Sequence, residues 1–172
     1  RYGAGESYGG YAKNALFLNE GGQRFLDVAY FMGVALEEDC RNVVADDLDG
    51  DGKLDLLVTT YLVWPENQQA LHLFRNNFNE AGNWIGFRLR ETKPGFSPVG
   101  AKLTLTTTAG QQLRWLVTGD SYRAQHATTA HFGLGALTNA ESVEIRWPNG
   151  KTQRLVAPAI NRYHEVRPEA GL

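Results

Sequence analysis

The sequence predicts an all-β protein, in which a blade-like antiparallel sheet with an acidic loop is followed by a β-sandwich. Two observations support the sandwich: apolar and polar residues alternate in short runs through the second half of the chain, as in strands that bury one face, and Gly-containing turns separate these runs. A third observation is that helical periodicity is scarce. Only residues 27–38 form a plausible helix, and Gly33 weakens it.

We expect three segments: an N-terminal arm over residues 1–13, a repeat-like unit over 14–80 and a sandwich over 81–172. The arm carries no periodic apolar face. Two interpretations of residues 1–11 stay open, a flexible arm and an extended strand that pairs with another subunit. Gly and Tyr suit such a strand, because the backbone can approach a neighbour closely while the rings pack on it.

An acidic loop lies between two predicted strands, residues 42–45 and 54–61, which are rich in β-branched or aromatic residues. Oxygen donors recur at alternate positions of this loop. They are the carboxylates of Asp47, Asp49, Asp51 and Asp55 and the backbone carbonyl of Lys53. This set predicts a Ca²⁺ site, since Ca²⁺ takes about six to eight oxygen ligands.

The loop is not an EF-hand. Val58 stands where an EF-hand places its bidentate Glu, and the flanking segments are predicted strands instead of helices. The alternative is a polar hairpin loop whose acids are only solvated. Crowded carboxylates repel one another without a cation, which favours the metal site.

Residues 15–19 and 72–76 resemble each other at an offset of 57 residues. Sequence periods of this order indicate propeller blades or related β arrays, and a propeller needs several blades to close. The chain holds only one unit and the start of a second, and it begins at Arg1 instead of Met. We therefore expect either a piece of a longer protein or a unit that finds its neighbours in other chains.

The pattern in the second half of the chain predicts β-hairpins. Apolar residues alternate over residues 85–89, 103–105, 113–117 and 143–147, with turns at 109–110 and 148–150. Their phase predicts a sandwich core that contains Phe87, Leu103, Leu105, Trp115, Phe132, Ile145 and Trp147.

Composition excludes several classes of partner. The formal net charge of −2 gives no reason to expect binding to nucleic acid or to anionic membranes. No apolar run approaches the length of a membrane span. Cys40 is the only cysteine, so internal disulfides are impossible, and we expect a small buried side chain.

Two ordered sets of motifs resemble known families. The first half resembles an FG-GAP/VCBS-type calcium-binding repeat through Asn14-x-Leu16-Phe17-x-Asn19-x-Gly21-Gly22-x-x-Phe25 and Val44-Ala45-x-Asp47-x-Asp49-x-Asp51-Gly52-x-x-Asp55-Leu56. The second half resembles the ASPIC/UnbV domain that follows such repeats in cartilage acidic protein-like and bacterial secreted proteins. Its matching motifs are Asn83-Trp84-Ile85-Gly86-Phe87-Arg88-Leu89, Gly100-Ala101-Lys102-Leu103, Gly119-Asp120-Ser121-Tyr122-x-x-Gln125, His131-Phe132-Gly133-Leu134-Gly135 and Arg146-Trp147-Pro148-Asn149-Gly150.

The resemblance implies calcium in the acidic loop and a secreted, extracellular or cell-surface adhesion or matrix module. Catalysis is not expected. Asp120, Ser121, His126 and His131 cluster in sequence, but no Gly-x-Ser-x-Gly elbow surrounds Ser121. His131 is better explained as a hydrogen-bonded structural residue.

The function predicted from the sequence is therefore a calcium-stabilised structural module that assembles with itself or with neighbouring repeats of a longer chain. Strand addition at open sheet edges would generate a fibre. The alternative is a carbohydrate- or matrix-binding module, with a polysaccharide stacked on exposed aromatic rings.

Overall fold

The computed structural model describes residues 11–62, 68–79, 82–90, 97–119 and 121–168. These residues form strands and turns without a helix, which confirms the all-β prediction. They divide into two compact units. No helix that could cross a membrane occurs in the described ranges.

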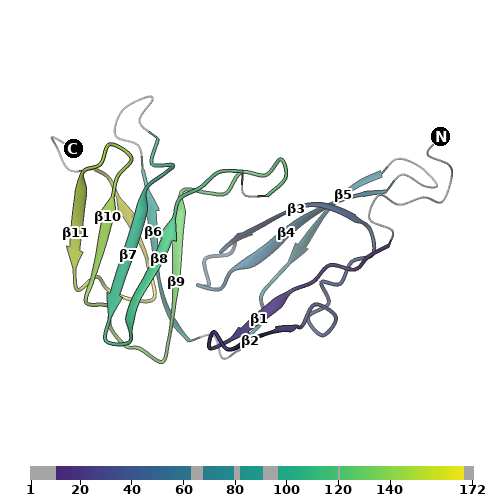
Figure 1. The fold of residues 1–172 in the computed structure, drawn as a ribbon, viewed down its shortest axis with the longest axis horizontal. Helices are drawn as coiled ribbons and strands as arrows, with labels where there is room; N and C mark the ends of the chain where they lie inside the picture. The colour runs from purple at the N-terminus through teal and green to yellow at the C-terminus, as the bar shows by residue number, and fades with distance from the viewer. Residues whose placement is uncertain (1–10, 63–67, 80–81, 91–96, 120, 169–172) are drawn as a thin grey trace. The chain divides into compact units, whose positions relative to one another are not determined.

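The first unit contains two small sheets (Figure 1). Strands β1 (Phe17–Glu20) and β2 (Arg24–Asp27) form an antiparallel hairpin. Strands β3 (Asp39–Asp46), β4 (Asp55–Leu62) and β5 (Gln68–Phe74) form a three-stranded sheet in that order. This sheet corresponds to the predicted blade.

The helix expected over residues 27–38 is absent. The segment makes a single helical turn, in which the Met32 amide donates to the Val28 carbonyl at 3.0 Å. Gly33 then adopts φ +71°, a left-handed conformation that ends a helical turn. The prediction failed because this one backbone position stops propagation before a second turn forms.

The second unit holds the predicted β-sandwich. One sheet has the order β11-β10-β7-β8. Its strands are β7 (Lys102–Thr107), β8 (Gly110–Trp115), β10 (Ser142–Arg146) and β11 (Thr152–Val156). The other sheet has the order β12-β6-β9, built from β6 (Asn83–Leu89), β9 (Thr129–Gly135) and β12 (Tyr163–Val166). The described strand pairings of this unit are antiparallel except that of β12 with β6, which is parallel.

The sandwich core confirms six of the seven predicted buried residues. Phe87, Leu103, Leu105, Phe132, Ile145 and Trp147 are all at most 1% exposed. They form one apolar cluster to which both sheets contribute.

Trp115 was predicted inside and is 54% exposed. Its strand, β8, pairs with β7 so that Trp115 lies opposite Lys102 while the buried Leu103 lies opposite Arg114. Paired residues point to the same face of a sheet, so Trp115 shares the outer face with Lys102. The alternation along β8 was read correctly, but its phase was inverted, which a shift of one residue suffices to do.

Candidate metal site

The acidic loop is folded by its own carboxylates. Asp47 accepts backbone hydrogen bonds from Gly50 at 2.8 Å and from Gly52 at 2.9 Å. Asp49 accepts from the Asp51 amide at 3.2 Å, and Asp51 accepts from the Lys53 amide at 2.9 Å. Such local side-chain contacts are typical of Asp in tight turns, so the spacing that predicts a metal site also predicts this loop conformation.

Three of the predicted ligands are brought together. Asp47, Asp49 and Asp51 each offer a carboxylate oxygen, and these oxygens lie within 4.8 Å of one another. Asp47 is buried, whereas Asp49 and Asp51 are exposed. Anionic oxygens gathered in this way fit a hard cation such as Ca²⁺.

The two remaining predicted ligands, Asp55 and the Lys53 carbonyl, are not part of this group of three carboxylates. Asp55 is buried at the start of β4, and Lys53 directs its ammonium to Asp51 at 3.0 Å. Their role as ligands, through the Asp55 carboxylate and the Lys53 carbonyl, stays a prediction.

The loop belongs to the same compact unit as the sandwich, since residues Asp46–Leu54 group with it. The Gly52 carbonyl lies 2.9 Å from Nε2 of His131 on β9, so the imidazole donates this hydrogen bond. A Cβ added to Gly52 would lie 1.9 Å from Nε1 of Trp84 on β6. The backbone of the loop therefore rests directly against sheet β12-β6-β9.

Three rings make up the surface on which the loop rests; we call Trp84, His131 and Tyr163 the ring cluster. Trp84 stacks on His131 with ring centroids 5.3 Å apart, and its centroid lies 4.7 Å from that of Tyr163. The three residues come from the three strands of one sheet. In β6, Trp84 precedes the buried Ile85, and in β9, His131 lies between the buried Ala130 and Phe132. The ring cluster therefore occupies the outer face of the sandwich.

Gly86 makes room for this cluster. It pairs with Tyr163 on one side and His131 on the other, and a Cβ added to it would lie 2.2 Å from the Tyr163 ring. The guanidinium carbon of Arg88 lies 4.1 Å from the centroid of the Tyr163 ring, a cation–π distance.

Burial and charge perturb two groups of the cluster. Burial lowers the pKa of His131, partly offset by its hydrogen bond to Gly52 and by the charge of Asp47. Burial and the neighbouring Asp47 carboxylate both raise the pKa of Tyr163. The Tyr163 hydroxyl is buried, and it lies beside the carboxylate of Asp47, a predicted ligand.

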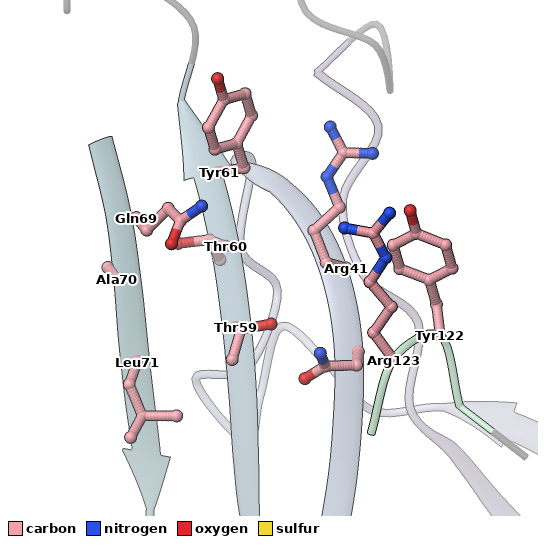
Figure 2. Close-up of a pocket in the computed structure, with 10 residues that line it drawn as sticks. Arg41, Thr59, Thr60, Tyr61, Gln69, Ala70, Leu71, Tyr122 and Arg123 are labelled. Atoms are coloured by element: carbon pink, nitrogen blue, oxygen red, sulfur yellow. The ribbon is translucent and has the colours of Figure 1, made fainter. Parts of the chain in front are cut away.

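A groove in the first unit is the second candidate site (Figure 2). It measures about 790 Å³, and ten residues line it: Arg41, Asn42, Thr59, Thr60, Tyr61, Gln69, Ala70, Leu71, Tyr122 and Arg123. In Figure 2 the two guanidinium groups lie between the rings of Tyr61 and Tyr122. None of the described residues that line the groove carries a carboxylate, so the groove favours an anionic or hydroxyl-rich ligand.

The residues considered for catalysis do not form a described triad. Asp120 lies outside the described residues. Ser121 Oγ accepts a hydrogen bond from the Val43 amide at 2.9 Å, and His131 is engaged with the acidic loop. Cys40 is a partly buried free thiol whose sulfur accepts from the Asn14 amide group at 3.0 Å.

Comparison with known proteins supports the two resemblances. Residues 4–58 match the model of an FG-GAP-like repeat, and residues 91–172 match the model described as ASPIC and UnbV. This chain combines an FG-GAP-like repeat with an ASPIC and UnbV domain. The acidic loop is thus the loop of the FG-GAP-like repeat, although it packs on the sandwich that contains the ASPIC and UnbV match.

Curated relatives match most of this chain. Cartilage acidic protein 1 of mouse and of human are each 39% identical over 139 residues, and that of Xenopus tropicalis is 36% identical over the same length. These alignments cover 78% of this chain and 20–21% of the relatives. The chain therefore spans about a fifth of the length of the curated relatives it matches.

Sequence reasoning predicted the loop and a hydrogen-bonded structural role for His131, which its contact with Gly52 confirms, but it did not predict that the loop rests on Trp84 and Tyr163. A signal was present, because Trp84 and His131 stand at positions that alternate with buried residues. A large ring on the outward phase of a strand indicates that something covers it. Which segment covers it could be learned only from the fold.

Proposed function

We propose that this chain is a non-catalytic, calcium-stabilised extracellular module with a structural or adhesive role. The observation that carries the proposal is the gathering of three carboxylates in the loop of an FG-GAP-like repeat. The extracellular location is supported by the relatives, whose name associates them with cartilage, a tissue built around extracellular matrix.

Asp47, Asp49 and Asp51 would hold the cation, with Asp55 and the Lys53 carbonyl as further ligands. The bound ion would neutralise the mutual repulsion of these acids and lock the loop. A ligand that binds only the folded state adds about 2.7 kcal/mol to its stability at a concentration of 100 times its Kd.

We expect Ca²⁺ to raise the free energy of unfolding, and chelator to lower it again. Asp51→Asn should lose most of this response because it removes a charged ligand while keeping the size of the side chain. Glu144→Gln is the control, since Glu144 is an exposed acid on β10. Denaturant unfolding of the three proteins with Ca²⁺ and with chelator measures the effect. Identical stability of the unmodified chain in both conditions would refute the calcium proposal.

We also propose that the first unit associates with neighbouring repeats of a longer chain or with further copies of itself. Its two sheets expose large apolar side chains, which mark interaction surfaces. Phe17, Phe25, Leu71 and Leu73 are between 60% and 66% exposed. Strands β3 and β5 are the outer strands of their described sheet, so strand addition has open edges to use. Repeated head-to-tail addition would generate a fibre.

The N-terminal arm is the proposed pairing strand, although residues 1–10 lie outside the described residues. We expect removal of residues 1–11 to lower the molar mass of the native assembly in light scattering. A truncated chain that keeps the mass of an oligomeric full chain would contradict this role. A full chain that is monomeric at high concentration would leave neighbouring repeats of a longer protein as the partner.

Carbohydrate or matrix binding is the second candidate function, and the groove of Figure 2 favours it. Guanidinium groups suit sulfate or carboxylate groups of an acidic polysaccharide, and tyrosine rings provide apolar faces for sugars. Arg123 has φ +54°, an uncommon conformation for a non-glycine residue that often marks a functional position. If this is the function, the chain should bind an acidic polysaccharide, and Arg123→Ala should weaken that binding.

A further inference from the structure

The acidic loop contacts the rest of its compact unit at successive points along its length. Asp47 lies beside the Tyr163 ring, and Gly52 contacts both Trp84 and His131. Past the last ligand of the gathered group, Lys53 Nζ donates to the Phe78 carbonyl at 3.4 Å. Its neighbour Leu54 accepts a hydrogen bond from the Asn76 side chain at 3.2 Å.

We propose that Trp84, His131 and Tyr163 are positioning residues for the cation loop, so that Ca²⁺ binding is energetically coupled to the ASPIC and UnbV sandwich. The inference rests on the proposed calcium site and adds a role for a part of the chain that supplies none of its ligands. The ring cluster holds the backbone of the loop in the conformation in which its carboxylates converge.

Close approach is the first argument. Gly52 has φ +87°, and its Cα faces the Trp84 indole with no space for a side chain. Gly50, which also has positive φ, has nothing within 4 Å of an added Cβ. Only one of the two loop glycines is therefore required by contact with the sandwich, and it directly follows the ligand Asp51.

Hydrogen bonding is the second argument. The Gly52 amide donates to Asp47 and the Gly52 carbonyl accepts from His131. One peptide segment thus connects the buried ligand to the ring cluster. Displacing His131 would free this segment, and with it the geometry of Asp47 and Asp51.

Coupling of this kind is reciprocal. If the sandwich pre-organises the loop, removing a positioning contact weakens Ca²⁺ binding, because part of the binding energy must then order the loop. By the same linkage, Ca²⁺ stabilises the sandwich less in such a variant.

The test compares Ca²⁺ affinities of full-length variants by calorimetry, after confirming that each is folded. His131→Ala removes the contact to Gly52. His164→Ala is the matched control, because His164 lies on β12 of the same sheet and its Nε2 is 2.7 Å from the Ala159 carbonyl, outside the cation loop. We expect His131→Ala to raise the Kd about two- to tenfold, the equivalent of one net hydrogen bond, and His164→Ala to leave it unchanged.

A second readout uses Tb³⁺ as a luminescent substitute for Ca²⁺, excited through tryptophan. Trp84 contacts the loop, whereas Trp115 lies on β8 in the other sheet. We expect Trp84→Phe to lose most of the sensitised emission and Trp115→Phe to retain it. If His131→Ala fails to fold, the comparison of Trp84→Phe with Trp115→Phe tests the positioning role instead.

The outcomes separate the two proposals. No Ca²⁺ binding by the unmodified chain would overturn both the calcium site and the positioning role. Binding by the unmodified chain with an unchanged Kd in His131→Ala, or sensitised emission that survives Trp84→Phe, would overturn the positioning role alone.

Discussion

Replacing Trp147 by alanine is expected to lower the free energy of unfolding by about 3–5 kcal/mol, the usual cost of truncating a large buried aromatic side chain. Trp147 is 1% exposed and belongs to the core cluster between the two sheets of the sandwich. Its indole Nε1 also donates to Gln153 at 3.2 Å. The substitution therefore leaves a cavity and an acceptor that has lost its donor.

Trp115→Ala is the matched control, because it deletes the same side chain from the outer face of β8, where Trp115 is 54% exposed. The Nζ of Lys102 lies 5.7 Å from the centroid of the Trp115 ring. We expect a cost near the roughly 0.5 kcal/mol that is usual for surface substitutions. Denaturant unfolding measures both variants, and equal costs would mean that the phase assigned to β8 is wrong.

Gly52→Ala is expected to cost about 2–5 kcal/mol, the second large effect. A non-glycine residue in left-handed backbone costs roughly 1–2 kcal/mol, and Gly52 has φ +87°. The new methyl group would also overlap Trp84 at 1.9 Å. Relieving such an overlap by moving the loop or the indole costs about 1–3 kcal/mol more.

Gly50→Ala separates these two terms. Gly50 has φ +79° but no atom near an added Cβ, so it should show only the backbone cost of roughly 1–2 kcal/mol. Unfolding of both variants in chelator excludes any contribution from a bound ion. A cost of Gly52→Ala no larger than that of Gly50→Ala would show that the loop does not rest on Trp84.

The sequence by itself determined the class of the fold and the chemistry of the loop. Strands 103–105 and 143–147 were predicted with their buried faces, because a buried face imposes a period of two on nearby residues. Asp47, Asp49 and Asp51 were predicted together because the loop closes through bonds between residues at most five positions apart. Each of these features is decided by short-range spacing, which the linear sequence displays.

Only the tertiary structure decided which face of β8 is buried and what covers the ring cluster. Both depend on pairing between segments that are distant along the chain. The phase of β8 follows from its register with β7, and the loop is held by a hydrogen bond between residues 79 positions apart, Gly52 and His131. Alternation along one strand is unchanged when the strand is turned over. A backbone carbonyl is present in every residue, so the sequence does not show which carbonyl accepts a hydrogen bond. Trp84 and His131 could therefore be recognised in sequence motifs, but their contact with the acidic loop is visible only in the folded structure.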